Sequence, residues 1–283
     1  MLLALLVFGG GLAYWCGLVT NQRTALITGG AVLAISLGIM LSDEGIDPRA
    51  IPFLAFTALL AFTLKRAPQG IWPSVGWAVF ITVVLALGFR VIPCFEPVET
   101  VPTAEHLYRF PPEKGVLMLL VPPMILVPWS SQKADKPSGR PWLMSLFILA
   151  GILAAVVPLA LITGFVRPGL TTLSMPYLVY WLIYNLIYTC VLEESFFRGI
   201  LQNALIRGFN RTLAPATARA AGIAVAAVFF GLAHFGGGTT YVALATLAGV
   251  GYGLAYELTG RLHHAVLVHF GVNAMYLLVF SWA

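Results

Sequence analysis

The apolar stretch at residues 142–163, WLMSLFILAGILAAVVPLALIT, contains no charged residue and is the starting point for predicting the fold. A helix needs about 20 predominantly apolar residues to cross the hydrocarbon core of a bilayer. The stretch is therefore long enough to span a membrane. The composition points the same way for the rest of the chain, since 59% of the 283 residues are hydrophobic and only 10% are charged. This balance excludes an ordinary water-soluble domain.

Further apolar stretches along the chain predict several membrane spans. With the first, they occupy residues 2–19, 25–41, 51–64, 75–89, 115–127, 142–163, 177–205, 220–235, 241–256 and 264–280. Two of them are short, those at 51–64 and 115–127, and prolines interrupt the second of these. None has the alternation of a membrane β-barrel strand. We therefore predict an all-α, polytopic integral membrane bundle of eight to ten transmembrane helices.

One polar segment predicts where the chain divides. Residues 130–140 (SSQKADKPSGR) combine charge with proline and glycine, as a solvated connector does. We expect N-terminal membrane helices of unassigned role in residues 1–140 and a separate membrane core in residues 141–283. The net charge of +5 is not gathered into a basic patch, so we expect no nucleic-acid partner. The expected partner is the lipid bilayer, and the expected location is multi-pass in a membrane, the bacterial inner membrane.

Ionisable residues inside the later apolar stretches are the candidates for function. An ionised side chain at mid-bilayer costs at least ~2.5–3.5 kcal/mol on insertion scales, so such groups need partners or a water-filled cavity. On a continuous α-helix, Glu194 and Arg198 are four residues apart on one face and are placed to form an ion pair. Glu193 is rotated off that face and has no local counterion. It is therefore the carboxylate that remains free to act as a general base.

Two further motifs lie on later apolar stretches. Phe230 precedes His234 by one helical turn, and a run of three glycines follows the histidine. His269 and Asn273 share a face of the last stretch, because they are four residues apart. Taken singly, each motif is also explained by interhelical hydrogen bonding. Taken together with the glutamates, they predict one functional site.

Together, the three motifs resemble a known family. They are Glu193-Glu194-x-x-x-Arg198, Phe230-x-x-x-His234 and His269-x-x-x-Asn273. Their order, residue types and approximate spacing are similar to those of the CAAX-protease and bacteriocin-processing (CPBP, or Abi) family, which includes the type II CAAX prenyl endopeptidases. The resemblance covers residues 141–283, which would be the protease core, and leaves the first half unassigned.

This resemblance implies an intramembrane endopeptidase that hydrolyses a peptide bond of a membrane-associated or prenylated, CAAX-like protein or peptide. The implied roles are water activation by Glu193 and His234, oxyanion stabilisation by His269 and Asn273, and support by Glu194 and Arg198. Family members are often labelled metalloproteases, so zinc held by Glu and His is an alternative. The His-Glu-x-x-His pattern is absent, so no metal ligand is assigned and glutamate-type chemistry is slightly preferred.

Two other functions stay open at this stage. Glu, His and Arg in membranes also mark ion pathways, so a proton-coupled transporter is one alternative. A non-catalytic scaffold or immunity protein that keeps the polar network is the other. Depth presents a difficulty for a single site, because fully crossing segments would put His234 on the opposite side of the membrane from Glu193 and His269. A re-entrant or tilted helix at residues 220–238 would remove this difficulty.

Overall fold

The computed structural model describes residues 2–20, 22–42, 45–66, 71–102, 107–125, 140–169 and 174–282. The chain forms two compact units, Met1–Met124 and Ile125–Ala283. The predicted connector at residues 130–140 lies, except for Arg140, outside the described residues. The predicted all-α class is confirmed, because helices dominate both units and the strands of the described residues form two short two-stranded ribbons.

The N-terminal unit begins with a helical hairpin, α1 (Leu2–Thr20) and α2 (Arg23–Ser42). A Cβ on Gly29 would collide with the backbone of Tyr14, so only glycine allows this close approach of the two helices. Two apolar helices follow, α3 (Ala50–Leu64) and α4 (Ile71–Gly88), and they pack against each other. An antiparallel ribbon, β1 (Val98–Pro102) and β2 (Leu107–Phe110), leads into the short helix α5 (Pro112–Leu120) and a 3₁₀ turn (Pro122–Met124).

One predicted transmembrane stretch of this unit is wrong. The described part of that stretch, residues 115–125, does not form a spanning helix, because α5 has nine residues and ends just before Pro122 and Pro123. Proline lacks the backbone N–H that an α-helix needs and clashes with the preceding turn. The segment is therefore too short to cross a bilayer.

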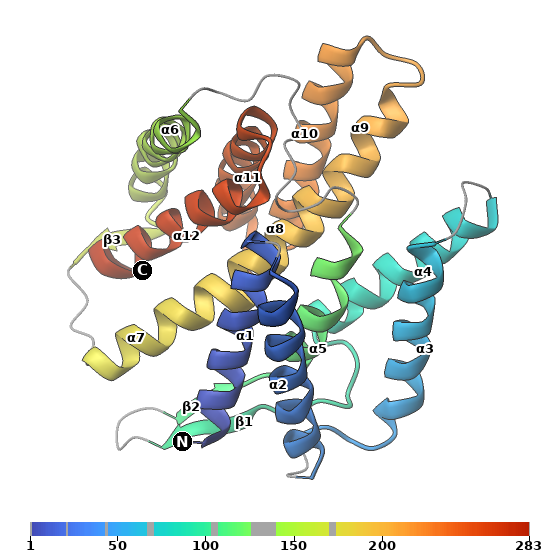
Figure 1. Cartoon of the computed structure of the whole chain (residues 1–283). Helices are drawn as coiled ribbons and strands as arrows, with labels where there is room; N and C mark the ends of the chain where they lie inside the picture. Colours follow the sequence, from blue (N-terminus) through green and yellow to red (C-terminus); the bar gives the residue numbers. More distant parts are fainter. Residues whose placement is uncertain are drawn as a thin grey trace. The chain divides into compact units, whose positions relative to one another are not determined.

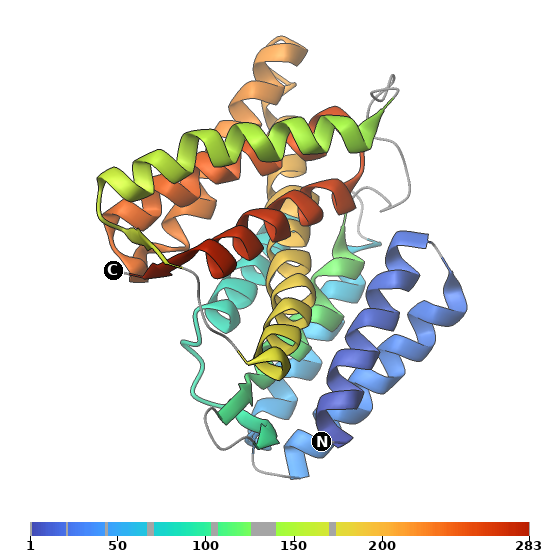
Figure 2. The same cartoon turned by 90° about the vertical axis from the view of Figure 1, so that its left-hand side faces the viewer.

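The C-terminal unit is a helical bundle (Figures 1 and 2). It begins with α6 (Pro141–Ile162) and strand β3 (Val166–Pro168). A long helical run follows, made of α7 (Met175–Tyr184), a π-helical segment (Asn185–Val191), α8 (Leu192–Glu194), a second π-helical segment (Ser195–Gln202) and α9 (Asn203–Phe209). The chain ends with α10 (Pro215–Leu232), a 3₁₀ turn (Phe235–Gly237), α11 (Thr239–Thr259), α12 (Leu262–Val279) and strand β4 (Phe280–Trp282).

Small residues position α11 at the centre of this unit. It packs against α6, α10 and α12, and Figure 2 shows α6, α11 and α12 side by side. A Cβ on Gly231 of α10 would collide with Thr246 of α11, and one on Gly251 would collide with Ile152 of α6. Glycine thus lets these helices approach closely, as membrane helices commonly do. Antiparallel pairing of β3 with β4 ties the end of α12 to the segment that follows α6.

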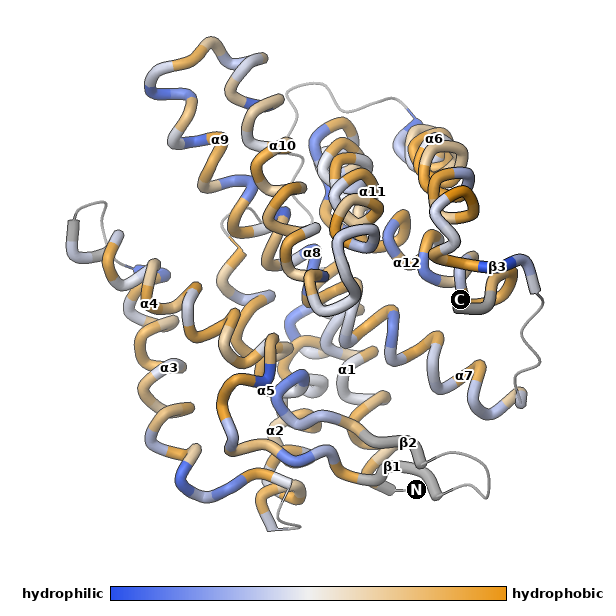
Figure 3. The backbone as a smooth tube through the Cα atoms, turned by 180° about the vertical axis from the view of Figure 1, so that it is seen from behind, coloured by the Kyte–Doolittle hydropathy of each residue, from blue (hydrophilic) through white to orange (hydrophobic). Residues whose placement is uncertain are grey.

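Seven helices of the described chain are long and apolar enough to cross a membrane. The shorter apolar helices Ala50–Leu64 and Ser74–Gly88 would bring the number to nine. Figure 3 shows apolar residues along most of the helices in both units. The fold is therefore that of a polytopic membrane protein, as the composition predicts.

The long helix bears on the predicted difficulty with depth. The run from Met175 to Phe209 has 35 residues, and Glu193 lies near its middle. The chain turns back into α10 after Phe209. His234 follows the end of α10 directly and lines the same cavity as Glu193. The re-entrant or tilted helix hypothesised at residues 220–238 stays a prediction; residues 220–232 belong to the uninterrupted α-helix Pro215–Leu232.

Candidate active site

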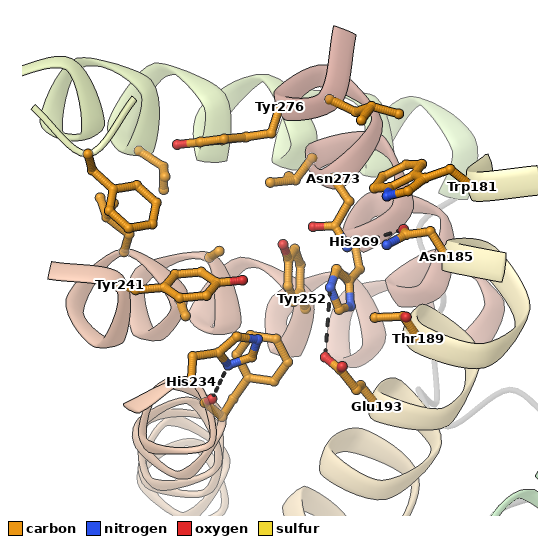
Figure 4. Close-up of a pocket in the computed structure, with 18 residues that line it drawn as sticks. Trp181, Asn185, Thr189, Glu193, His234, Tyr241, Tyr252, His269, Asn273 and Tyr276 are labelled. Atoms are coloured by element: carbon orange, nitrogen blue, oxygen red, sulfur yellow. Dashed lines mark hydrogen bonds and ion pairs between the residues drawn. The ribbon is translucent and has the colours of Figure 1, made fainter. Parts of the chain in front are cut away.

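A cavity of about 290 Å³ lies inside the C-terminal unit and contains all four residues predicted to be catalytic. Figure 4 shows Glu193, His234, His269 and Asn273 around it. The other lining residues are mostly apolar or aromatic: Val156, Phe165, Trp181, Asn185, Thr189, Phe230, Tyr241, Leu244, Ala245, Ala248, Tyr252, Val272, Tyr276 and Leu277. A largely apolar cavity with a few convergent polar groups is the usual form of a binding or active site.

Glu193 lies in the cavity wall with its carboxylate only partly satisfied. Its side chain is 22% exposed, and its Oε2 atom is buried without a hydrogen-bond partner among the described residues. The nearest cationic candidate is His269, whose Nε2 lies 4.0 Å from that oxygen. A buried carboxylate oxygen without a partner is costly unless water or a substrate group satisfies it. Glu193 is therefore placed to bind and polarise a molecule in the cavity.

Two π-helical segments flank Glu193, so the assumption of a continuous α-helix is wrong here. A π-helical turn holds more residues than an α-helical turn, and it therefore changes which side chains share a face. The three-residue α8 between the two segments holds both glutamates. Such local departures from α-helix are frequent at functional sites.

The predicted pair of Glu194 and Arg198 is present and is fully buried. Arg198 Nε donates to Glu194 Oε2 at 2.9 Å, and both side chains have no exposed surface. Glu194 has a second partner that the sequence did not predict, because His269 Nδ1–H donates to its Oε1 at 2.9 Å. The carboxylate therefore joins two helices and fixes the orientation of the imidazole. With Nδ1 held in this way, the Nε2 atom of His269 is the one directed at Glu193.

Aromatic rings hold His269 in place. The ring of Tyr252 is stacked on the imidazole, with 4.4 Å between centroids and 16° between planes. Phe230 meets it edge-on at 5.5 Å. Arg198 lies over the other side of the cluster, with its guanidinium carbon 5.4 Å from the centroid of Phe230. His269 is only 3% exposed, so its position is set by packing as well as by Glu194.

His234 is oriented by the backbone of the preceding turn. Its Nδ1–H donates to the carbonyl oxygen of Phe230 at 2.8 Å, which leaves Nε2 as the acceptor in the neutral ring. The ring also contacts Tyr241 edge-on at 4.8 Å. A Cβ on Gly237 would collide with Tyr241, so the glycine run provides the space that this aromatic contact needs. Figure 4 shows His234 and Tyr241 on the same side of the cavity.

Asn273 makes contacts that its predicted role does not include. Its Nδ2 donates to Asn185 Oδ1 at 3.2 Å and to Cys190 Sγ at 3.7 Å. Both N–H groups of the amide are therefore engaged by neighbours, and its oxygen is the atom left for the cavity. A role as oxyanion donor requires this amide to give up one of these partners when substrate binds.

Sequence reasoning missed several polar or aromatic residues of the cavity, among them Asn185, Thr189, Tyr241 and Tyr252. A signal for the first two exists in the sequence. They precede Glu193 by eight and four residues in an otherwise apolar stretch, and four-residue spacing tends to keep helical side chains on one face. The two tyrosines have no such signal, because aromatic residues are common throughout these helices.

The residues around the cavity have the chemistry of zinc ligands but not the arrangement. Two imidazoles with Nδ1 bound to an acceptor, together with a carboxylate, are groups that zinc accepts. Among the described residues, however, no three His, Cys, Asp or Glu side chains lie close enough together to hold a metal ion. The side chains as arranged here do not fit a metal, and no reaction step is assigned to one.

Comparison with known families supports the resemblance seen in the motifs. Residues 175–275 match the family model described as type II CAAX prenyl endopeptidase Rce1-like. The chain is similar to this family over that stretch, which is called the Rce1-like segment below. The resemblance is thereby confirmed over a segment that contains all three motifs, although it does not extend to the predicted start at residue 141. Neither the comparison with curated proteins nor the comparison with solved structures finds a match.

The Rce1-like segment coincides with most of the cavity. It includes α10, α11, the long helical run and α12 up to residue 275. Of the residues that line the cavity, Val156, Phe165, Tyr276 and Leu277 lie outside the segment. The family supports a CAAX-type intramembrane endopeptidase in general terms.

Proposed function

We propose that the protein is an intramembrane endopeptidase that hydrolyses a peptide bond of a membrane-associated, CAAX-like or prenylated protein or peptide. The observation that carries this proposal is the buried, unpartnered Oε2 of Glu193 in the wall of a cavity shared with two histidines. A carboxylate oxygen held in this way is available to accept a hydrogen bond from water. The Rce1-like segment supports the class of reaction.

In the proposed first step, Glu193 accepts a proton from water while the water oxygen attacks the carbonyl carbon of the scissile bond. His234 assists by accepting a hydrogen bond from the same water at Nε2, since its Nδ1–H is held by a backbone carbonyl. The protonated Glu193 then donates its proton to the departing amine as the C–N bond breaks. One group thus acts first as a general base and then as a general acid.

His269 and Asn273 are the proposed donors to the oxyanion of the tetrahedral intermediate. Preorganised donors of this kind contribute roughly 3–4 kcal/mol each to lowering the barrier. His269 donates from Nε2 when both ring nitrogens carry a proton, with Nδ1–H still bound to Glu194. The second donor, Asn273, requires its amide to turn from Asn185 toward the substrate.

Charge balance favours the proposed role of Glu194 and Arg198, which is to hold His269 in position. Glu194 and Arg198 carry opposite charges in a fully buried region and neutralise each other, and His269 adds a hydrogen bond to the same carboxylate. A neutral, hydrogen-bonded cluster is the least costly way to bury these groups. Arg198 therefore stabilises Glu194, and Glu194 in turn orients His269.

The proposal is tested with the purified full-length protein in detergent and a library of synthetic peptides, analysed by mass spectrometry. We expect defined cleavage by the wild-type protein and a loss of at least about 100-fold for Glu193→Gln, which removes the base while preserving shape. Cleavage that survives this substitution sinks the mechanism. Incubation with a chelator followed by metal analysis tests zinc, and activity that disappears and returns with added Zn²⁺ would replace the glutamate mechanism.

A further inference from the structure

A stripe of polar residues leads away from the proposed reaction centre along one helix. Asn185, Thr189 and Glu193 line the cavity at successive four-residue intervals, and Figure 4 shows them along the same wall. Two of the three, Asn185 and Thr189, belong to none of the three motifs. Polar side chains are costly in an apolar membrane helix unless they have a partner, so these two require an explanation.

Asn185 presents an unused donor. The residue is 8% exposed, and its Oδ1 accepts hydrogen bonds from Asn273 Nδ2 at 3.2 Å and from Cys190 Sγ at 3.3 Å. These two contacts fix the direction of the amide, because its oxygen must face both donors. Its Nδ2 has no hydrogen-bond partner in the part of the chain that the structure describes. The group available to an occupant of the cavity is therefore an N–H donor.

Thr189 also keeps its hydroxyl free. Helical threonines usually donate to the carbonyl four residues earlier, as Thr246 and Thr259 do in this protein. Thr189 makes no such bond, and no other described residue binds its hydroxyl. It lies within the π-helical segment Asn185–Val191, where the pattern of backbone bonds differs from that of an α-helix.

Helix α12 supplies a third unused polar group. The hydroxyl of Tyr276 is buried without a partner among the described residues, and the residue lines the same cavity. Trp181 and Leu277 add apolar surface to the cavity. Polar groups and apolar surface together fit a substrate peptide, whose backbone has alternating polar groups and which can carry an apolar side chain.

We infer that Asn185 and Thr189 form a subsite that binds the backbone of an extended peptide on one side of the scissile bond. This inference rests on the proposed function and adds to it the form in which the substrate binds. A peptide in an apolar cavity must have its N–H and C=O groups paired, because the bilayer offers no water for them. Asn185 donates to a substrate carbonyl, and the Thr189 hydroxyl can pair with either group.

Helix geometry predicts which substrate residues the subsite contacts. The α-helical rise of about 1.5 Å per residue gives upper limits of about 6 Å for Thr189 and about 12 Å for Asn185 from Glu193 along the helix axis, because the π-helical segment that holds both residues rises less per residue. An extended peptide advances about 3.3 Å per residue. The subsite therefore contacts the substrate within about two and within about four residues of the bond that is cut. Asn185 is assigned to neither the attacking water nor the oxyanion, so it is a positioning residue.

The experiment measures kcat and KM of the full-length protein on a library peptide that the wild-type protein cleaves. We expect Asn185→Ala and Thr189→Val each to raise KM by about 3-fold to 10-fold, as the loss of one hydrogen bond predicts. For Thr189→Val, which leaves the bond between Asn185 and Asn273 in place, kcat should change less than about 2-fold. The matched control is Asn203→Ala. Asn203 is a buried asparagine of the same helix that bonds to Gly199 and Tyr256 and does not line the cavity. KM should stay at the wild-type value in this control.

Backbone-modified substrates identify the contact directly. An ester in place of the amide three or four residues from the scissile bond weakens the carbonyl as an acceptor. We expect it to raise KM for the wild-type protein but not for Asn185→Ala, since that variant has already lost the donor. An ester penalty that persists undiminished in Asn185→Ala, or a fall in kcat at constant KM, overturns the subsite. Thr189→Val answers the same question without disturbing Asn273, in case Asn185→Ala does not fold.

Failure of the subsite is distinguishable from failure of the proposed function. Binding of the library peptides is measured in parallel to Glu193→Gln, alone and combined with Asn185→Ala. If the double variant binds more weakly while the wild-type protein cleaves nothing, the endopeptidase function fails and the subsite stands. If cleavage occurs and the two variants bind equally well, the subsite is wrong and the endopeptidase function stands.

Discussion

Removing the charge of Arg198 should show how strongly the stability of the protein depends on the buried ion pair of Arg198 and Glu194. Arg198 and Glu194 are both completely buried and are joined at 2.9 Å, and the same carboxylate accepts a hydrogen bond from His269 at 2.9 Å. Breaking a buried ion pair from one side typically costs about 3–5 kcal/mol, because it leaves an unpaired buried charge. We therefore expect Arg198→Met to lower the free energy of unfolding by about that amount. Glu194→Gln should have a similar effect, since it leaves the guanidinium unpaired.

The double variant Glu194→Gln/Arg198→Met should recover most of that loss. Both charges are then absent, and replacement of a whole buried pair is often close to neutral. The four proteins form a double-mutant cycle that is measured by thermal and denaturant unfolding in one detergent. We expect a coupling of at least about 5 kcal/mol, because two single losses of about 3–5 kcal/mol are mostly recovered in the double variant, and this exceeds the roughly 0.5–3 kcal/mol that is usual for interacting residues. If the two single losses simply add in the double variant, the ion pair is not the stabilising interaction and the reasoning is refuted.

In that double variant we expect stability to recover and the rate of peptide cleavage to stay low. His269 keeps a neutral amide in place of the carboxylate that orients its Nδ1–H, so the imidazole loses its charged acceptor. We expect the double variant to fold at nearly wild-type stability and to cleave peptide at least about tenfold more slowly. Recovery of both stability and cleavage would show that the carboxylate is not needed to position the imidazole.

Three other predictions concern packing, the buried thiol and pH. Gly231→Ala should cost about 1–3 kcal/mol because its Cβ would collide with Thr246, whereas Gly151→Ala, with open space around it, should be neutral or slightly stabilising in the same thermal assay. Cys190 has no exposed surface, so a thiol-specific reagent should leave it unlabelled in mass spectra of the folded protein and label it after unfolding. Burial raises the pKa of Glu113 above its ordinary value, so the stability it contributes is present at acid pH and is lost as the pH rises through that raised pKa. Unfolding curves of Glu113→Gln should lack this fall, and an unchanged pH profile would contradict it.

The class of fold and the ionisable residues of the cavity were predictable from the sequence alone. Apolar stretches of bilayer length predict membrane helices whatever their neighbours, because the bilayer imposes that length on each one separately. Local spacing likewise predicts the contact between Glu194 and Arg198, which needs only one helical turn. The three motifs also name the residues that gather at the cavity, since ionisable groups inside apolar helices are rare and require a purpose.

Which of these side chains are in contact, and which of their atoms form hydrogen bonds, depends on the tertiary structure. The bond from His269 to Glu194 and the bond from Asn273 to Asn185 each join residues at least 75 positions apart. Such pairings depend on how the helices are packed, and no local pattern encodes that packing. The π-helical segments beside Glu193 depend on the same packing, because the usual helical ladder is locally abandoned there. Glu193 and His234 line the same cavity because the chain folds back after Phe209, and the order of the apolar stretches along the sequence does not show this.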